Sequence, residues 1–264
     1  MSRSRHVGLG FFVLVLYAAY SLYIGKGSNQ SNEKQQVTVN EVEIIKGEVN
    51  VATATVSYYH CGPTYGATGN NQGNVGGKDK EIILLHGAAF TKQNWVDSGI
   101  LKDFCSAHLS VYALDLNTRG LTGDSFVRTL EAFQEQGLIS GNPMTIVTPS
   151  ASGKALVDMG AAAVIAAAVK NGKEIALTRF VRVWIPVASG SVLTASGKAI
   201  EAFRNVHVLA IHGAQDEMGR KVTKRLVELA GATPVEMYGT HPCYLDSPKD
   251  FVETILAFLS NTVG

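Results

Sequence analysis

From Glu81 to the C-terminus, short apolar runs alternate with longer amphipathic segments, and this alternation limits the possible folds more than any other feature of the sequence. The apolar runs predict strands at 82–85, 111–116, 144–148, 180–187, 206–212 and 234–238. The segments between and after them predict helices at 91–108, 124–137, 152–170, 195–203, 219–231 and 247–260. Strands that alternate with helices form a parallel sheet that is covered by helices on both faces.

Two further strands are predicted before this region, at 37–45 and 49–59, with the turn Lys46-Gly47-Glu48 between them. This arrangement predicts an antiparallel hairpin, which would complete a mostly parallel sheet of about eight strands. Between residues 187 and 206 there is room for a short helix only, so no large lid domain is expected. Residues 61–80 are rich in Gly and Asn and predict a long surface loop without chemistry.

The predicted strand at 144–148 runs into a turn of small residues, Thr-Pro-Ser-Ala-Ser-Gly at 148–153. In α/β-hydrolases a strand leads into a sharp turn of this kind, which exposes a nucleophilic serine. Ser150 has small residues at each crowded position around it, whereas Ser152 would have Lys154 at one of them. Ser150 is therefore the predicted nucleophile, and Ser152 could cap the helix that follows. Neither flanking glycine of the common G-x-S-x-G pattern is at its usual place.

Two other residue types follow Ser150 in the order that such a hydrolase needs. Asp216 comes just after the strand at 206–212, and His241 comes just after the strand at 234–238. The chain order Ser, Asp, His is that of α/β-hydrolases and differs from the orders in chymotrypsin and subtilisin. A serine hydroxyl needs a general base, so His241 is the predicted base and Asp216 the residue that orients it.

Three nearby residues are weaker alternatives. Asp246 is the rival acid, but it is expected in the cap region of the last helix. His212 is the rival base because it ends a strand near Asp216, although a packed, hydrogen-bonded histidine is more common at such a place. Cys243 is expected to be a packing residue, since a serine turn already supplies the nucleophile.

The loop at 86–90, His-Gly-Ala-Ala-Phe, follows another predicted strand. In this fold the loop donates one backbone N–H to the oxyanion hole, and the residue after the nucleophile donates the other. Ala88 is the predicted first donor, with Ala89 as the alternative, and Ala151 is the predicted second donor. His86 is expected to form a hydrogen bond within the loop and not to transfer protons.

Composition and charge exclude several other functions. A formal net charge of +1 gives no reason to expect a nucleic acid partner. The cysteines, Cys61, Cys105 and Cys243, are too scattered for a zinc site and too few for a disulfide framework, and at least one must stay unpaired in a monomer. No phosphate-binding glycine loop lies between a strand and a helix. We therefore expect no metal and no organic cofactor.

The N-terminal segment 7–24 contains no charged residue and is about long enough to span a bilayer. We predict a cytoplasmic N-terminus at 1–6, a signal-anchor transmembrane helix at 7–24, a linker at 25–36 and a catalytic domain at 37–264. Positive charge before the helix would place the catalytic domain on the non-cytoplasmic side of the membrane. Cleavage as a signal peptide is the alternative and would make the protein secreted.

Several of these segments resemble the α/β-hydrolase domain-containing protein 14 family, which includes CCG-one-interacting factor B. The segment at 241–248, His-Pro-Cys-Tyr-Leu-Asp-Ser-Pro, is similar to the GHPCYLDKP-like segment of that family. The turn at 148–153 is similar to its S-P-S-L-S-G, and Gln-Asp-Glu-Met-Gly at 215–219 is similar to its Q-D-P-M-G. The run Leu-Leu-His-Gly-Ala-Ala-Phe at 84–90 also matches, and the similarity covers roughly residues 37–264.

The resemblance implies that Ser150, Asp216 and His241 form a triad that acts on small acyl esters such as p-nitrophenyl acetate. It also implies an acyltransferase or deacetylase alternative, in which coenzyme A accepts the acyl group. An N-terminal apolar helix is typical of the membrane-anchored branch of the family. One departure lies at 115–125, where the loop is longer than the family's D-L-P-G-x-G-x-S and lacks its proline, so substrate preference is not carried over.

The sequence thus predicts a serine hydrolase that cleaves small acyl esters or amides through an acyl-enzyme and is bound to a membrane by its N-terminal helix. Transfer of the acyl group to coenzyme A or another acceptor is one alternative, because the acyl-enzyme is common to both reactions. A hydrolase-fold module that only binds a partner is the other, since a fold alone does not prove a function.

Overall fold

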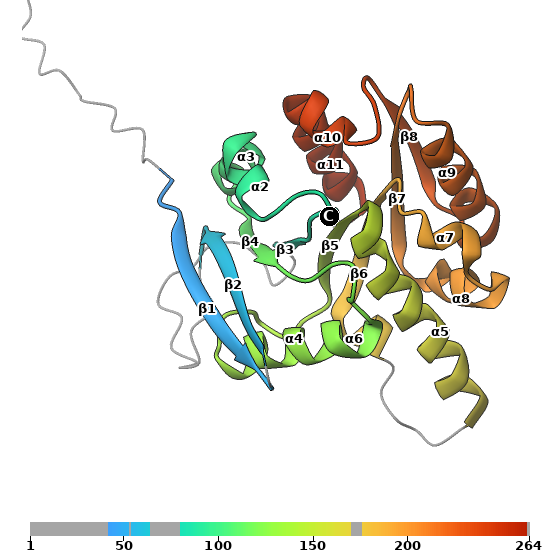
Figure 1. The fold of residues 1–264 in the computed structure, drawn as a ribbon, viewed down its shortest axis with the longest axis horizontal. Helices are drawn as coiled ribbons and strands as arrows, with labels where there is room; N and C mark the ends of the chain where they lie inside the picture. Colours follow the sequence, from blue (N-terminus) through green and yellow to red (C-terminus); the bar gives the residue numbers. More distant parts are fainter. Residues whose placement is uncertain (1–41, 53, 64–79, 170–175, 263–264) are drawn as a thin grey trace, which may run out of the picture. The chain divides into compact units, whose positions relative to one another are not determined.

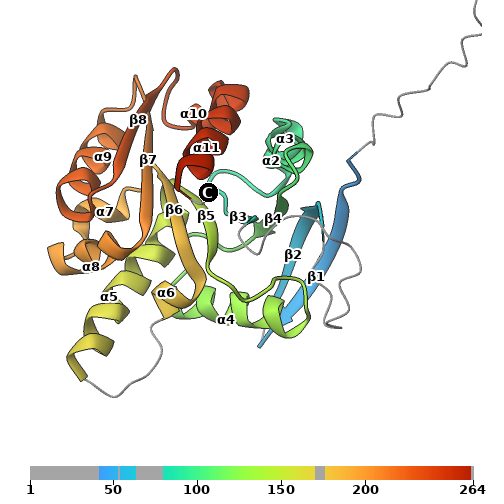
Figure 2. The same ribbon diagram turned by 180° about the vertical axis from the view of Figure 1, so that it is seen from behind.

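A mixed sheet of eight strands lies at the centre of the computed structural model, which describes residues 42–52, 54–63, 80–169 and 176–262 (Figure 1 and Figure 2). The strands are β1 (Ile45–Val51), β2 (Ala54–Cys61), β3 (Glu81–Leu84), β4 (Ser110–Asp115), β5 (Met144–Pro149), β6 (Val181–Val187), β7 (His207–Gly213) and β8 (Thr233–Met237). Their order in the sheet is β1-β2-β4-β3-β5-β6-β7-β8. The pairs β1–β2 and β2–β4 are antiparallel and the others are parallel, which confirms the predicted fold class.

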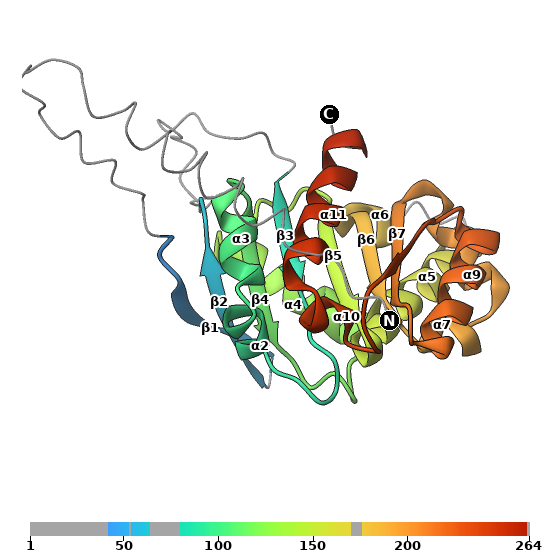
Figure 3. The same cartoon turned by 90° about the horizontal axis from the view of Figure 1, so that it is seen from above.

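Helices cover both faces of the sheet, as Figure 3 shows from above. One face carries α2 (Gln93–Asp97), α3 (Ile100–Ser106), α10 (Cys243–Asp246) and α11 (Pro248–Thr262). The other carries α4 (Gly123–Glu135), α5 (Gly153–Val169), α6 (Ala176–Phe180), α7 (Ser191–Thr194), α8 (Gly197–Glu201) and α9 (Glu217–Ala230). In β3, Ile82 and Leu84 pack in the core on the side of α3 and α11, whereas Ile83 packs in the core on the side of α4 and α5. This follows because successive strand residues point to opposite faces of the sheet.

The predicted position of the hairpin turn is wrong. Lys46-Gly47-Glu48 lies inside β1, and the chain turns between Val51 and Ala54, which pair with each other. Gly47 lies opposite Tyr58, and a Cβ atom on Gly47 would be 2.3 Å from the Tyr58 ring. The glycine therefore makes room for an aromatic ring from the neighbouring strand and does not mark a turn.

Two predicted helices have other bounds in the structure. The segment 91–108 contains two helices, because Gly99 adopts φ 80° between α2 and α3. The segment 195–203 begins later than predicted, since the Ser196 side chain accepts a hydrogen bond from the Ala199 N–H and caps α8. The short helices α6, α7 and α10 were not predicted, and Phe180, predicted as the first strand residue, ends α6. Because α7 and α8 are short, the connection from β6 to β7 carries no large lid, as expected.

The predictions for residues 1–41, and for the loop at 61–80 beyond Pro63, lie outside the described residues. Of the predicted strand at 37–45, residues 42–44 are not part of a strand, and β1 begins at Ile45. Within the described ranges, one helical stretch, Ser150–Val169, is long and apolar enough to span a membrane. It contains the helix α5, whose residues Ala155, Leu156 and Met159 are buried in the core. The apolar composition of this stretch is therefore explained by its burial in the core of the domain.

Cys61 at the end of β2 forms a disulfide with Cys105 in α3, with 5.9 Å between their Cα atoms. Three cysteines require at least one unpaired thiol in a monomer, but this pair was not predicted. The free thiol is Cys243, which is buried. The disulfide ties a strand at one side of the sheet to a helix that covers it.

We predict that buried His60 makes the stability of the fold depend on pH. Its ring is buried, stacks on Tyr112 with 4.2 Å between ring centroids, and lies 3.4 Å from the Ser110 hydroxyl oxygen. Burial lowers the pKa of His60 to about 4. The unfolded chain therefore binds more protons between pH 6.5 and pH 4, and the free energy of unfolding falls as the pH falls through that window, by on the order of 2 kcal/mol.

We expect His60→Gln to flatten this part of the stability profile, because glutamine does not titrate. Denaturant unfolding of both proteins from pH 7.5 to pH 4 measures the effect. An equally steep fall in the variant would show that other groups cause the acid sensitivity.

Candidate active site

Ser150 lies at the junction of β5 and the helix α5. Strand β5 ends at Pro149, and Ser150 adopts φ 52° at the start of a 3₁₀ turn, Ser150–Ser152. A positive φ is uncommon for a residue with a side chain and costs free energy, so it persists only where the surroundings hold it. A strained turn of this kind between a strand and a helix is typical of the nucleophile position in α/β-hydrolases.

The neighbours of Ser150 are small because the turn packs tightly against the end of β6. A Cβ atom on Gly153 would lie 2.3 Å from the Cβ of Ser189. The Ser189 hydroxyl donates a hydrogen bond of 2.7 Å to the carbonyl oxygen of Thr148. Trp184 Nε1 donates a hydrogen bond of 2.8 Å to the Thr148 hydroxyl oxygen. The contacts of Ser189 and Trp184 were not predicted, since they join segments far apart in the sequence.

Ser152 lies inside the turn. Its side chain is buried, and its hydroxyl donates a hydrogen bond of 2.8 Å to the carbonyl oxygen of Pro149. The hydroxyl of Ser150 instead lies 3.0 Å from Nε2 of His241. Of the two serines, Ser150 therefore has the partner that a nucleophile needs.

Asp216 precedes the helix α9 and caps its N-terminus. Its Oδ1 accepts a hydrogen bond of 2.9 Å from the Gly219 N–H, and its side chain is buried. A carboxylate at a helix N-terminus is stabilised by the helix dipole. A Cβ atom on Gly219 would lie 2.6 Å from Asp216 Oδ2, so glycine is needed at this position.

His241 lies between Asp216 and Ser150. Its Nδ1 is 2.6 Å from Asp216 Oδ2, and its Nε2 is 3.0 Å from Ser150 Oγ. Because a carboxylate oxygen only accepts, Nδ1 carries the proton and Nε2 is free to accept the proton of the serine hydroxyl. The side chain of His241 is 40% exposed, so the site is open to small molecules.

The loop that carries His241 is held on two sides. The Gln215 N–H donates a hydrogen bond of 3.0 Å to the carbonyl oxygen of Gly239, and a Cβ atom on Gly213 would lie 2.0 Å from the carbonyl oxygen of Thr240. On the other side, Asp246 Oδ2 accepts hydrogen bonds from the N–H (2.6 Å) and the hydroxyl (2.8 Å) of Thr240. Asp246, the rival acid, thus holds the residue before His241, and Asp216 is the carboxylate on the imidazole.

We expect Asp246→Ala to lower kcat by about 10-fold to 100-fold, because a displacement of about 1 Å at a reacting group has an effect of this size. KM for a small ester should stay nearly unchanged, since Asp246 contacts the loop and not the substrate. Asp246→Asn keeps one acceptor oxygen and should recover part of the rate. If kcat is unchanged in a folded Ala variant, the loop does not depend on Asp246.

The loop after β3 packs against Ser150. A Cβ atom on Gly87 would lie 3.7 Å from the Cβ of Ser150. His86 Nδ1 donates a hydrogen bond of 2.9 Å to the carbonyl oxygen of Gly87, and the Leu116 N–H lies 3.3 Å from His86 Nε2. His86 therefore forms hydrogen bonds within and beside the loop, as expected. Ala88 is exposed beside this contact, and its role as an N–H donor stays a prediction, as does that of Ala151.

The other weaker alternatives are His212 and Cys243, and both side chains are buried. His212 is buried, and its Nε2 is 3.3 Å from Oε2 of Glu236 on the neighbouring strand. Burial raises the pKa of the Cys243 thiol to about 12, so a thiolate is not available at neutral pH. In the described part of the chain, no group of three or more His, Cys, Asp or Glu side chains could hold a metal ion.

Comparisons with known proteins agree with this fold. No protein-family model matches the sequence. Among solved structures, the predicted CIB-like hydrolase of Thermoplasma acidophilum has a TM-score of 0.60 at 16% identity and covers 83% of this chain and 99% of its own. The esterase RhEst1 of Rhodococcus sp. ECU1013 has a TM-score of 0.55 at 16% identity, and the match covers 84% of this chain and 99% of the esterase chain. The fold is therefore that of the α/β-hydrolases, and the arrangement of Ser150, His241 and Asp216 is one that serine hydrolases use.

Curated proteins that are similar in sequence include one from a fish and one from human. Protein ABHD14A of Danio rerio is 28% identical over 190 residues, which are 68% of this chain and 64% of that protein. The human protein named "Putative protein-lysine deacylase ABHD14B" is 27% identical over 192 residues, which are 67% of this chain and 82% of that protein. These relatives confirm the resemblance to the α/β-hydrolase domain-containing protein 14 family that the motifs indicated.

Proposed function

We propose that Ser150, His241 and Asp216 form the catalytic triad of a hydrolase that cleaves small acyl esters or amides through an acyl-enzyme. The observation that supports this most is the continuous hydrogen-bonded path from Asp216 Oδ2 through the imidazole to Ser150 Oγ. His241 Nε2 takes the proton of Ser150 as Oγ forms a bond to the acyl carbon. The protonated imidazole then gives that proton to the leaving group as the scissile bond breaks.

In the second half of the reaction, water attacks the acyl-enzyme and His241 accepts its proton. The carboxylic acid leaves and Oγ recovers a proton from the imidazole. The backbone N–H groups of Ala88 and Ala151 stabilise the negative oxygen of each tetrahedral intermediate. The contact between Gly87 and Ser150 supports this role, because it places the loop that carries Ala88 beside the nucleophile. No metal or organic cofactor takes part.

Transfer of the acyl group to coenzyme A or another acceptor is a second candidate. The name of ABHD14B describes a protein-lysine deacylase, so an acylated lysine side chain is a reasonable amide substrate for this chain. Product analysis with and without coenzyme A separates the two reactions: an acyl-coenzyme A product supports transfer, and free acid alone supports hydrolysis. A function in binding only is less favoured, because all three side chains of the triad are present and hydrogen-bonded.

The site can be tested by labelling the full-length protein with a fluorophosphonate probe and mapping the modified residue by mass spectrometry. We expect a label on Ser150 that is absent from the His241→Ala protein. An unlabelled but folded protein would contradict an activated serine and would favour the binding-only alternative.

We further propose that residues 7–24 anchor the protein in a membrane, with the domain at 37–264 on the non-cytoplasmic side. The disulfide between Cys61 and Cys105 supports this side, because disulfides persist in oxidising compartments. Protease protection of the tagged protein in sealed vesicles tests the orientation, and the mass of the mature chain tests whether the segment is cleaved. Digestion from the cytoplasmic side of intact vesicles would contradict the proposal.

A further inference from the structure

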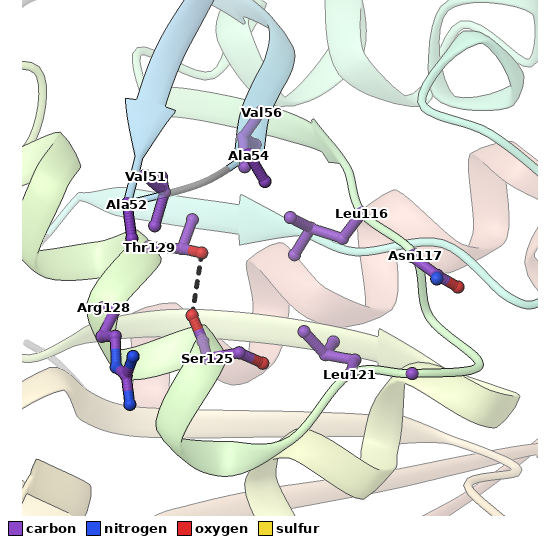
Figure 4. A pocket seen from close by; sticks show the side chains of 11 residues that line it. Val51, Ala52, Ala54, Val56, Leu116, Asn117, Leu121, Ser125, Arg128 and Thr129 are labelled. Atoms are coloured by element: carbon purple, nitrogen blue, oxygen red, sulfur yellow. Dashed lines mark hydrogen bonds between the residues drawn. The ribbon is translucent and has the colours of Figure 1, made fainter.

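A pocket of about 290 Å³ opens between the hairpin and the N-terminal part of the helix α4 (Figure 4). We name it the hairpin pocket. Its lining consists mostly of aliphatic side chains and the turn after β4: Val51, Ala52, Ala54, Val56, Leu116, Asn117, Gly120, Leu121, Ser125, Arg128 and Thr129. A volume near 300 Å³ is at the lower end of the range for ligand pockets, so the pocket fits a small ligand.

The polar side chains that α4 contributes to the lining already have partners. The Thr129 hydroxyl donates a hydrogen bond of 3.0 Å to the carbonyl oxygen of Ser125 (Figure 4). The Ser125 hydroxyl belongs to the capping box with Thr122. Arg128 forms an ion pair with Asp124 on its own helix. The surface that remains for a ligand is therefore mainly apolar.

The hairpin pocket lies at the same edge of the sheet as Ser150. In the parallel register, Leu84 of β3 pairs with Ala113 of β4 and with Val147 of β5. Three residues further along these chains are Leu116, which lines the pocket, and Ser150. One strand separates β4 from β5 in the sheet, so this register puts the two residues roughly 10 Å apart.

Direct contacts also connect the pocket to the nucleophile. The N–H of Leu116 lies 3.3 Å from His86 Nε2, and His86 Nδ1 donates to the carbonyl oxygen of Gly87. Gly87 in turn lies against Ser150. One residue of the pocket wall is thus connected through one side chain to the loop beside the nucleophile.

We propose that the hairpin pocket binds the aliphatic tail of the substrate's acyl group while the acyl carbon is at Ser150. This inference rests on the proposed hydrolase function and extends it to a substrate class: linear acyl groups longer than acetyl. The apolar lining supplies the affinity, and the position at the level of Ser150 makes one substrate able to reach both places. The small volume favours a medium chain over a long fatty acyl group, and a short chain would not span the distance from Ser150 to the pocket.

The test is a series of p-nitrophenyl esters, from acetate through butyrate and hexanoate to octanoate, with the full-length protein. We expect kcat/KM to rise with chain length by up to about fourfold for each methylene group that enters the pocket. Ala54→Phe places a ring in the pocket, because Ala54 is exposed at its wall. This variant should lose most of the rise with chain length.

Thr55→Phe is the matched control. Thr55 follows Ala54 in β2, and side chains of successive strand residues point to opposite faces. Its hydroxyl donates to Asn50 in β1, and Thr55 does not line the pocket. The control should keep the chain-length profile of the unaltered protein.

The outcomes separate this inference from the proposed function. If acetate is hydrolysed by the unaltered protein but not by Ser150→Ala, and Ala54→Phe leaves the chain-length profile unchanged, only the inference fails. If no ester is hydrolysed in a Ser150-dependent way, the proposed function fails as well. If octan-1-ol changes acetate hydrolysis without competing with octanoate ester, the pocket binds a separate molecule, which overturns the inference.

Discussion

Ser150→Ala should reduce kcat for a small ester by up to about a millionfold, the loss measured when the serine of a well-studied serine protease is removed. The variant keeps the backbone but removes the atom that forms the bond to the acyl carbon. The turn should stay intact, because no hydrogen bond in the described part of the chain joins the Ser150 hydroxyl to a group other than His241. Rates with p-nitrophenyl acetate, followed to the background of uncatalysed hydrolysis, measure the effect.

Ser152→Ala is the control for this experiment. It removes a buried hydrogen bond to Pro149 and should lower the free energy of unfolding by about 1 kcal/mol. Because Ser152 Oγ points into the turn, the variant should retain most of the activity. The assignment of the nucleophile is wrong if Ser152→Ala loses the activity and Ser150→Ala keeps it.

Asp216→Asn should reduce kcat by about ten-thousandfold, as the same change does in a serine protease triad. Asparagine can still accept the hydrogen bond from Gly219 through one oxygen, and it is a good helix cap, so α9 should stay folded. Its amide group, however, would donate to Nδ1 of His241 and leave the imidazole proton on Nε2. The base would then point a proton at Ser150 instead of accepting one.

The measurement combines kcat at several pH values with thermal unfolding of the same samples. A large loss of rate at nearly unchanged Tm supports the role of Asp216. Asp246→Asn is the comparison, since Asp246 also accepts hydrogen bonds near the site but does not contact the imidazole. If Asp246→Asn has the larger effect on kcat, the acid of the triad is assigned wrongly.

The predicted fold class was correct because it depends on local periodicity. The apolar runs around Ile82, Ile146 and Ile211 are too short for helices, and the segments between them have helical spacing. Burial on both faces follows from that pattern alone. The positions of turns were harder to predict, since Gly47 and Gly99 are the same residue type. One makes room for Tyr58 across a strand pair, and the other breaks a helix with a positive φ.

The candidate site was predictable for a related reason. The ends of parallel strands meet at one edge of a sheet, so Ser150, Asp216 and His241 could be placed together from their positions after three strands. The small residues around Ser150 indicated the sharp turn. The role of Asp246 could not be read from this pattern, because it depends on how the loop at Gly239 and Thr240 folds back over α10.

The order of the main strands and helices along the chain, the serine turn and the residue types of the site could be predicted, since each depends on neighbouring residues. The contacts between distant groups could not: His241 with Ser150, Cys61 with Cys105, and the hairpin with α4 around a pocket. Periodicity indicates which face of a segment is buried but not which other segment packs against it. Partners are selected by close packing of shapes across the core, which forms only when the whole sheet is assembled.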